Sequence, residues 1–158
     1  MSKDPYTYSL KLLSKRDYSE FKLRQKLSSK FPDVDLEDTI IQLIEKRFLR
    51  EEEYARIRVK SLILSGYSSS YIQMKLEDER LRVDNDFIHR VKIENGLQDS
   101  TTIASLIKKK MRYKTVPVSE DELLKLKHKL LNYLATKGHN LEESQDEIDR
   151  WLKTDECI

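Results

Sequence analysis

The sequence predicts an all-α fold, built as a tandem array of three three-helix repeats that is elongated and free to curve. Only three glycines and three prolines occur in 158 residues, and all six fall between segments with helical periodicity. Such residues suit helix ends, and so few of them leave little material for hairpin turns.

A short sequence phrase, or motif, also occurs three times. In each copy a ring residue is followed by Ser19, Ser68 or Asn140, with a leucine six residues before this polar residue and a leucine or isoleucine eight residues after it. The side-chain oxygen of the polar residue can cap a helix. Each phrase therefore predicts a helix, a tight corner and a second helix, and we expect the three corners to be structurally equivalent.

Residues 1–50 are predicted to form the first repeat. Pro5 opens a helix that ends near Asp17, Ser19 caps the second helix, and the third begins near Asp35. The apolar periodicity gives these inward positions: Tyr6, Leu10, Leu13, Leu23, Leu27, Leu36, Ile40, Leu43 or Ile44, and Phe48.

Residues 51–98 repeat the plan, with predicted helices at 51–65, 68–78 and 84–95. Gly96 supplies the stop after the last of them. The expected inward positions are Ala55, Val59, Leu62, Ile72, Leu76, Phe87 and Val91.

Residues 99–158 form the third repeat, whose first helix is broken by Pro117. Ser119 can cap a longer second helix, and Asn140 with Glu143 has the pattern of a capping box for the third. The expected inward positions are Ile103, Leu106, Ile107, Leu123, Lys127, Leu130, Leu134, Leu141, Ser144, Ile148, and Trp151 or Leu152. Because such short helices are not stable alone, neighbouring repeats should cover one another's apolar stripes.

The charge of the chain is informative in its distribution rather than in its sum. Thirty basic and 28 acidic residues leave a net charge of +2, which does not by itself indicate a nucleic-acid binder. Residues 3–30 hold eight basic and three acidic residues, whereas residues 100–119 hold five basic residues and no acid. From residue 139 onward the sign reverses, with seven acidic and two basic residues.

Two basic stretches are candidate binding surfaces for a partner or for nucleic acid. The densest contains Lys108, Lys109, Lys110, Arg112 and Lys114. The other surface consists of Lys15, Arg16, Lys22, Arg24, Lys26 and Lys30, with Lys22, Lys26 and Lys30 aligned on one side of the helix after Ser19. Its candidate site residues are Lys22, Arg24 and Lys26. Closely spaced cations gain counterion-release entropy at a polyanion, but a solvated helix face has the same composition. The sequence leaves both interpretations open for each stretch.

The sequence offers no pattern typical of an enzyme, a metal site or a cofactor site. His89, His128 and His139 lack metal-ligand spacing, and three isolated glycines cannot build a phosphate-cradling loop. A hydrolase or transferase hypothesis therefore has no supporting constellation. The single cysteine, Cys157, cannot form an internal disulfide. No apolar run approaches the ~18 residues of a membrane span, so we expect a cytoplasmic monomer without membrane contact.

Four segments resemble the RecX family of regulatory proteins. Residues 16–27, RDYSEFKLRQKL, are similar to the family's opening pattern R-x-x-S-E-x-E-L-x-x-K-L. Residues 47–55, RFLREEEYA, are similar to its G-Y-L-D-D-x-x-F-A pattern, and the resemblance continues through residues 66–76 and 137–152. The chain departs from the family at Lys22, where an acid is usual, and at Arg47 and Arg80, where glycine is common. These departures concern partner contacts more than the fold.

The resemblance implies a regulatory function that composition and periodicity alone do not. It implies a non-enzymatic protein that binds the filament of a RecA-type recombinase on single-stranded DNA, with no cofactor. Such a protein restrains the ATPase and strand exchange of the recombinase in homologous recombination, DNA repair and the SOS response. Weak direct DNA binding is compatible with this function. The alternative is an independent helix-turn-helix-like DNA-binding module, because short helices that meet at a tight corner also describe that motif.

Overall fold

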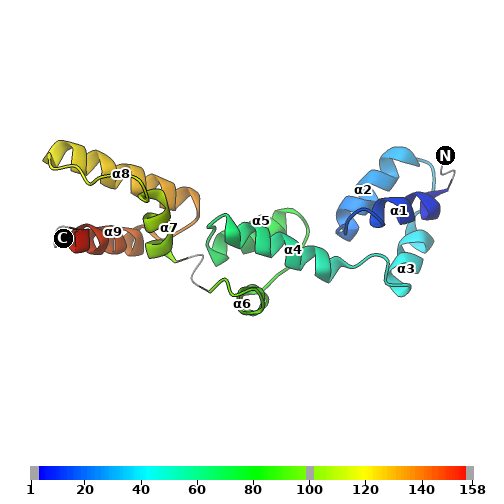
Figure 1. Cartoon of the computed structure of the whole chain (residues 1–158). Helices are drawn as coiled ribbons and strands as arrows, with labels where there is room; N and C mark the ends of the chain where they lie inside the picture. The colour runs from blue at the N-terminus through cyan, green and yellow to red at the C-terminus, as the bar shows by residue number, and fades with distance from the viewer. Residues whose placement is uncertain (1–3, 99–101, 156–158) are drawn as a thin grey trace. The chain divides into compact units, whose positions relative to one another are not determined.

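The computed structural model describes residues 4–98 and 102–155, and in this part of the chain it contains nine α-helices and no strand (Figure 1). The helices are α1 (Pro5–Leu13), α2 (Glu20–Lys30), α3 (Glu37–Glu45), α4 (Glu51–Leu64), α5 (Ser69–Asp78), α6 (Asn85–Glu94), α7 (Ile103–Lys110), α8 (Glu120–Thr136) and α9 (Leu141–Asp155). The prediction of an all-α helical array is confirmed. Cys157 lies outside the described residues.

The chain divides into two compact units. The first unit comprises Met1–Arg58 and Leu76–Val83, and the second comprises Val59–Lys75 and Asp84–Ile158. The boundary between them therefore passes through α4 and through α5.

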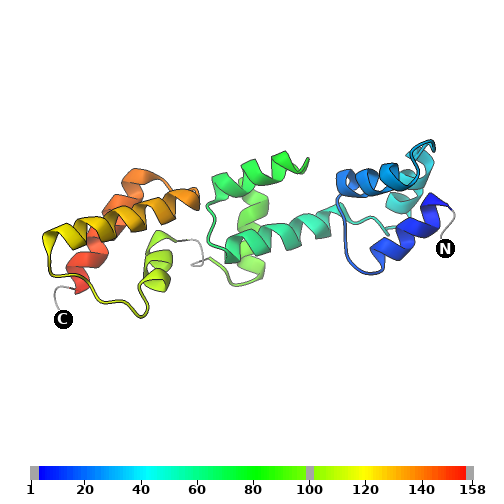
Figure 2. The same ribbon diagram turned by 90° about the horizontal axis from the view of Figure 1, so that it is seen from above.

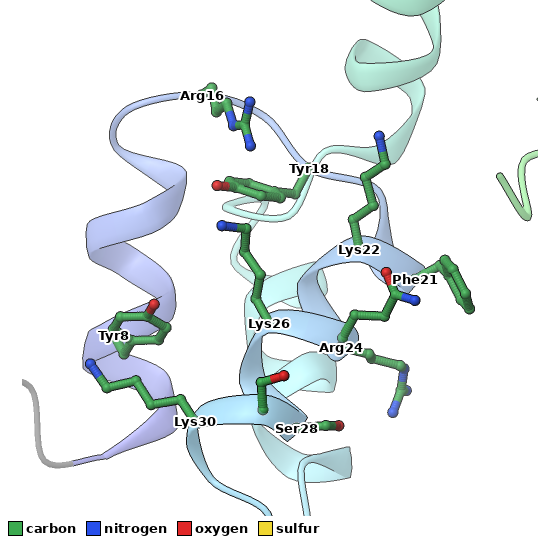
Figure 3. Close-up of a pocket in the computed structure, with 11 residues that line it drawn as sticks. Tyr8, Arg16, Tyr18, Phe21, Lys22, Arg24, Lys26, Ser28 and Lys30 are labelled. Atoms are coloured by element: carbon green, nitrogen blue, oxygen red, sulfur yellow. The ribbon is translucent and has the colours of Figure 1, made fainter.

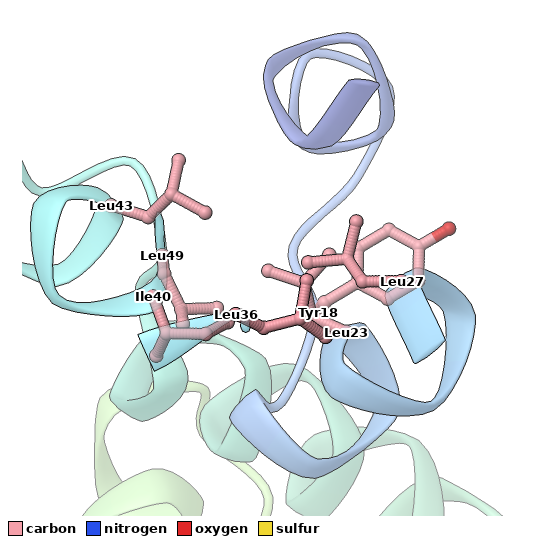
Figure 4. Close-up of a cluster of buried hydrophobic side chains, with 7 residues drawn as sticks. All are labelled: Tyr18, Leu23, Leu27, Leu36, Ile40, Leu43 and Leu49. Atoms are coloured by element: carbon pink, nitrogen blue, oxygen red, sulfur yellow. The ribbon is translucent and has the colours of Figure 1, made fainter. Parts of the chain in front are cut away.

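The first unit has a core of seven buried side chains, contributed by α2, α3 and the segments that flank them (Figure 4). These residues are Tyr18, Leu23, Leu27, Leu36, Ile40, Leu43 and Leu49. Helix α1 covers this core with partly buried side chains that include Tyr8 and Leu10. Its fully buried residue is Ser9, whose hydroxyl donates to the Pro5 carbonyl at 2.7 Å. The predicted inward stripe of α2 is confirmed, whereas the predicted α1 positions Tyr6, Leu10 and Leu13 pack against the core but are only partly buried.

In the first unit, α1 and α2 each begin at a side chain that caps the helix. The Asp4 carboxylate accepts from the Thr7 N–H at 2.9 Å, and the Ser19 hydroxyl accepts from the Lys22 N–H at 3.2 Å. The end of α1 differs from the prediction, because the helix stops at Leu13 rather than near Asp17. The hydroxyl of the next residue, Ser14, donates to the Lys11 carbonyl at 2.7 Å, which favours termination.

Helix α3 ends in a way that reverses one predicted core position. Arg47 has φ 60°, and the Phe48 N–H donates to the Leu43 carbonyl at 2.9 Å, as in a Schellman motif. This left-handed residue ends the helical periodicity, so that Phe48 is 45% exposed and Leu49 is 6% exposed. The prediction of Phe48 as a core residue was wrong, and Leu49 takes its place.

The middle helices bury mostly the predicted residues. Ala55, Val59 and Leu62 of α4 are buried, as are Ile72 and Leu76 of α5.

Helix α6 is capped by the Asp84 carboxylate, which accepts from the Phe87 N–H at 2.7 Å. It buries Ile88 with Val91, and Phe87 is only partly buried. Because Ile88 lies one residue beyond the predicted Phe87, the buried stripe is rotated from the expected one.

In the second unit, α7, α8 and α9 pack on one another around a second core (Figures 1 and 2). Its buried residues are Leu106, Ile107, Met111, Leu130, Leu134, Ile148 and Leu152. Asn140 caps α9, because its side-chain oxygen accepts from the Glu143 N–H at 3.1 Å. Ser144 is buried, and its hydroxyl donates to the Asn140 carbonyl. Three expectations fail here, the first because α7 ends at Lys110 and not at Pro117. Ser119 precedes α8 without a side-chain capping bond, and Leu141 is exposed because it lies in the first turn of α9, beyond the core.

Two of the three corners lie against each other in the second unit. The Ser68 N–H donates to the Lys137 carbonyl at 2.8 Å, and His139 Nε2 lies 3.0 Å from the Gly66 carbonyl oxygen. The Lys137 ammonium lies 4.4 Å from the centroid of the Tyr67 ring. His139 therefore has the structural role of a corner ring.

The expected equivalence of the three corners is correct for the caps and wrong for the first helix end. Gly66 and Gly138 both have positive φ, and the N–H of the residue after each glycine donates to the carbonyl five residues earlier, as in a Schellman motif. The corner before Ser19 contains no residue with positive φ. The first repeat thus reaches its second helix through a different backbone path.

Candidate basic binding surfaces

The candidate lysines and arginine of α2 border a shallow groove on the first unit (Figure 3). We call it the α1–α2 groove, and its open volume is about 1160 Å³. It is lined by Tyr8, Arg16, Tyr18, Phe21, Lys22, Arg24, Gln25, Lys26, Ser28, Ser29 and Lys30. The structure therefore brings the three candidates Lys22, Arg24 and Lys26 to one surface, together with residues that the sequence did not single out.

Arg24 is engaged in ion pairs within the protein. Its guanidinium lies 3.0 Å from Glu20 and 2.8 Å from Glu37. The hydrogen bond to Glu37, with that to Glu20, raises the pKa of Arg24. Its charge is thus largely neutralised by neighbours.

Lys22 is also held by partners in the first unit. Its ammonium donates to the Tyr54 hydroxyl at 2.6 Å and lies 3.7 Å from the Glu79 carboxylate. Glu79 also pairs with Arg58 at 2.8 Å, and this hydrogen bond raises the pKa of Arg58. Lys22 therefore belongs to a small structural network.

Lys26 differs from these two residues, because it has no acidic partner in the described part of the chain. Its ammonium lies 5.7 Å from the centroid of Tyr18, and the Arg16 guanidinium lies 4.7 Å from the same ring. Lys30 lies 3.8 Å from the centroid of Tyr8. Sequence reasoning placed Lys30 on the α2 stripe but did not select it as a site residue. The contacts of Arg16 and Lys30 with tyrosine rings depend on tertiary structure.

The second candidate surface, which we call the α7 basic end, consists of Lys108, Lys109, Lys110, Arg112 and Lys114. All five side chains are exposed, and the three lysines lie in the last turn of α7. Cations there interact favourably with the negative end of the helix dipole. Within residues 4–98 and 102–155, no carboxylate lies within ion-pair distance of any of the five. The neighbouring Tyr113 is 93% exposed.

One cation of the α7 basic end also contacts a ring. The Lys110 ammonium lies 4.7 Å from the centroid of Tyr133 on α8. The other four cations have solvated side chains, and they can meet an external anion without breaking an ion pair in the described structure.

The acidic residues at the start of α4 have a structural role, and the described residues contain no candidate metal site. Glu52 and Glu53 stand in the first turn of α4 and pair with Arg56, as expected for carboxylates at a helix start. Among the described residues, no group of three or more His, Cys, Asp or Glu side chains is arranged to hold a metal ion. No helix in residues 4–98 and 102–155 is both long and apolar enough to cross a membrane.

Comparison with known proteins finds similarity to one family, the RecX regulatory proteins. A model of the first three-helix domain of RecX matches residues 6–43, which cover all but the first residue of α1, all of α2 and most of α3. The regulatory protein RecX of Haemophilus influenzae is 27% identical over 149 residues, covering 94% of this chain and 95% of that protein. These matches support the RecX family for this chain. RecX proteins of Mannheimia succiniciproducens and Vibrio cholerae are 32% and 30% identical over 72 and 73 residues, which is just under half of each chain.

The similarity to RecX proteins supports a regulatory role for the chain. The family model ends before the α7 basic end and includes the whole α1–α2 groove.

Proposed function

We propose that this chain binds the filament that a RecA-type recombinase forms on single-stranded DNA, and restrains its ATPase and strand exchange. The observation that carries the proposal is the similarity to a regulatory protein RecX along 94% of the chain. A nucleoprotein filament is a polyanion through its DNA, and the exposed cations of the α7 basic end are suited to such a partner. The proposed protein acts in the cytoplasm as a monomer, with no cofactor and no catalysis of its own.

The proposed mechanism is differential binding. A ligand that contacts adjacent filament subunits, and that fits one filament state better than another, shifts the population toward the favoured state or blocks subunit addition. The proposed arrangement for this contact is three repeats in series, at residues 1–50, 51–98 and 99–158. Each repeat contributes three helices, α1–α3, α4–α6 and α7–α9.

The α7 basic end is the proposed contact in the third repeat. Variants that test it should not destabilise α7 by placing negative charge at the negative end of its dipole. Replacing Lys108, Lys109 and Lys110 by glutamate would place acids at the negative end of α7, at a cost of about 0.3–1 kcal/mol each. Neutralisation to glutamine avoids most of this cost. The test variant therefore changes Lys108, Lys109, Lys110, Arg112 and Lys114 to Gln.

The experiment measures co-sedimentation with recombinase-coated single-stranded DNA, and the ATPase rate of the recombinase. A matched control changes five other exposed cations of the second unit to Gln: Lys60, Arg90, Lys125, Lys129 and Lys153. We expect the wild type and the control to bind the filament and slow its ATPase, and the test variant to lose about tenfold or more in affinity, as several lost phosphate contacts require.

Two outcomes would contradict the proposal. If the wild type neither binds the filament nor changes the ATPase rate, the recombinase is not the partner. If the wild type binds bare duplex DNA more strongly than the filament, the helix-turn-helix-like alternative is favoured. Equal filament binding by wild type and test variant would leave the filament as partner and exclude the α7 basic end from the contact.

A further inference from the structure

Lys92 is a partly buried cation for which the protein supplies no acid. It stands in the last turn of α6, and its Nζ donates to the hydroxyl of Ser69 at 3.3 Å. In the part of the chain that the structure describes, no carboxylate lies within ion-pair distance of this ammonium. Other lysines differ: Lys127 pairs with Asp149 at 3.3 Å, and Lys60 is exposed to solvent. Because burial removes water from an ammonium, a lysine in the position of Lys92 holds its proton less firmly.

The start of α5 adds a second electrostatic cost. Ser69 is the first residue of α5, so its hydroxyl lies where the helix dipole is positive. The first turn of α5 contains no acidic residue that would offset this field. Burial lowers the pKa of Lys92 from its ordinary 10.5, and the positive end of α5 acts in the same direction. Lys92 and Ser69 both belong to the second unit, so their contact lies within one compact body.

A lysine in such surroundings is a more reactive nucleophile at neutral pH than a solvated lysine. Only the neutral amine has the lone pair that attacks a carbonyl carbon, and desolvation together with a nearby positive charge increases the neutral fraction. Ser69 also orients the amine, because its oxygen accepts one N–H of Nζ. The backbone N–H groups at the start of a helix attract anions, so an anionic reagent is favoured at this place. These features are those of a site for acylation by an anionic reagent.

We propose that Lys92 is a modification site that is acylated by an acyl phosphate. The amine nitrogen attacks the carbonyl carbon of the reagent, and an N–C bond forms. The C–O bond to the phosphate breaks, inorganic phosphate leaves with the electron pair, and the proton of the amine passes to water. The product is an amide, in which the positive charge of Lys92 is lost. The acyl phosphate is itself the activated reactant, so the transfer needs no other co-reactant.

The modification should be compatible with the fold. It breaks no ion pair, because Lys92 has none in the described structure. The amide keeps one N–H, which can still donate to Ser69. It also removes positive charge from the start of α5, next to Ser68, whose N–H donates to the Lys137 carbonyl in the contact between the two corners. We therefore expect acylation at Lys92 to leave the second unit folded.

The rate of acetylation at each lysine of the wild-type chain tests the proposal. The protein is incubated with acetyl phosphate at neutral pH, and mass spectrometry of its peptides gives the initial rates. Exposed lysines of the second unit, Lys60, Lys125 and Lys129, serve as the internal comparison. We expect an initial rate at Lys92 that is at least about threefold higher than at each of them. A rate at Lys92 equal to or below those of the exposed lysines would refute the proposal.

Two substitutions at the start of α5 separate the contact with Ser69 from a general effect of charge. Ser69→Asp places a carboxylate at the hydrogen-bond partner of Nζ, where it stabilises the ammonium and also suits the helix start. We expect it to lower the rate at Lys92 about threefold or more, with the rates at the exposed lysines unchanged. Ser70→Asp is the matched control, because Ser70 is exposed and lies in the same helical turn but is not the partner of Lys92. Equal effects of the two substitutions, or no effect of either, would contradict the site.

Two further measurements test the reagent and the tolerance of the fold. The excess of the Lys92 rate over the exposed lysines should be larger with acetyl phosphate than with acetyl-CoA, whose reacting thioester carries no negative charge; the reverse order would overturn the choice of an acyl phosphate. Lys92→Gln, which resembles the neutral product, should unfold in urea at a midpoint no lower than that of the wild type. A clearly lower midpoint would show that the fold does not tolerate the modification. None of these measurements involves the recombinase or the α7 basic end, so their outcomes are independent of filament binding.

Discussion

Replacing Gly138 with alanine tests the contact between the two corners of the second unit. Gly138 has φ +82°, and a Cβ at this position would lie 2.7 Å from both the Tyr71 Cβ and the Ser68 Oγ. The Tyr71 Cβ is fixed to its helix backbone and cannot rotate away. The same corner carries the hydrogen bond from the Ser68 N–H to the Lys137 carbonyl, 2.8 Å long. A shift that relieves the clash must therefore lengthen this bond.

The expected loss of stability can be estimated from three contributions. The left-handed backbone costs alanine about 1–2 kcal/mol, of which about 0.4–1 kcal/mol is offset because alanine restricts the unfolded chain. Overpacking against Tyr71 costs about 1–3 kcal/mol. Weakening of the bond to Lys137 costs about 0.5–1.5 kcal/mol. The expected destabilisation by Gly138→Ala is therefore about 1.5–6 kcal/mol.

Gly96→Ala is the matched control, because it has the backbone contribution without the clash. Gly96 has φ +64°, and no atom lies within 4 Å of the point that an alanine Cβ would occupy there, so its replacement should cost about 1.5 kcal/mol or less. Urea denaturation followed by circular dichroism at 222 nm gives both free energies of unfolding. Equal losses in the two variants would refute the contact between the corners. A larger loss in Gly96→Ala would refute the backbone argument as well.

Three further perturbations test the core, a helix end and a half-buried lysine. Leu27→Ala and Leu76→Ala should each destabilise by about 2–5 kcal/mol in urea denaturation, because both side chains are fully buried; losses under ~1 kcal/mol would show that the stripe is misplaced. Arg47→Gly should stabilise by up to about 1 kcal/mol, since its φ of 60° suits glycine, and Arg47→Ala serves as a control that should not stabilise. Burial lowers the pKa of Lys92 from its ordinary 10.5, so the unfolded chain binds this proton more tightly and the contribution of Lys92 to stability rises with pH between the two pKa values. Lys92→Met should accordingly be more stable than the wild type at pH 7, with an advantage that shrinks toward pH 10.5; an advantage independent of pH would contradict this cause.

Features that depend only on neighbouring residues were predicted correctly from the sequence. A capping oxygen needs only a backbone N–H a few residues away, and Ser19, Ser68 and Asn140 all cap the predicted helices. The positions of Leu27 and Leu76 follow from helical periodicity, and both are fully buried. Local propensity and pattern were sufficient for the helical class and for most of the core.

Tertiary structure decided which basic residues are free to bind. Arg24 is neutralised by Glu37, and Lys22 is held by Tyr54 and Glu79, all from other helices or segments. Arg16 and Lys30 belong to the basic surface that the sequence predicts, but their contacts with tyrosine rings depend on where the corner and α1 lie. Ion pairing and ring contacts act over a few ångströms in space, and a linear pattern of charges does not contain those distances. The same holds at the end of α3, where the left-handed Arg47 turns Leu49 inward instead of Phe48, because the packing of the core sets the direction of the chain after the helix ends.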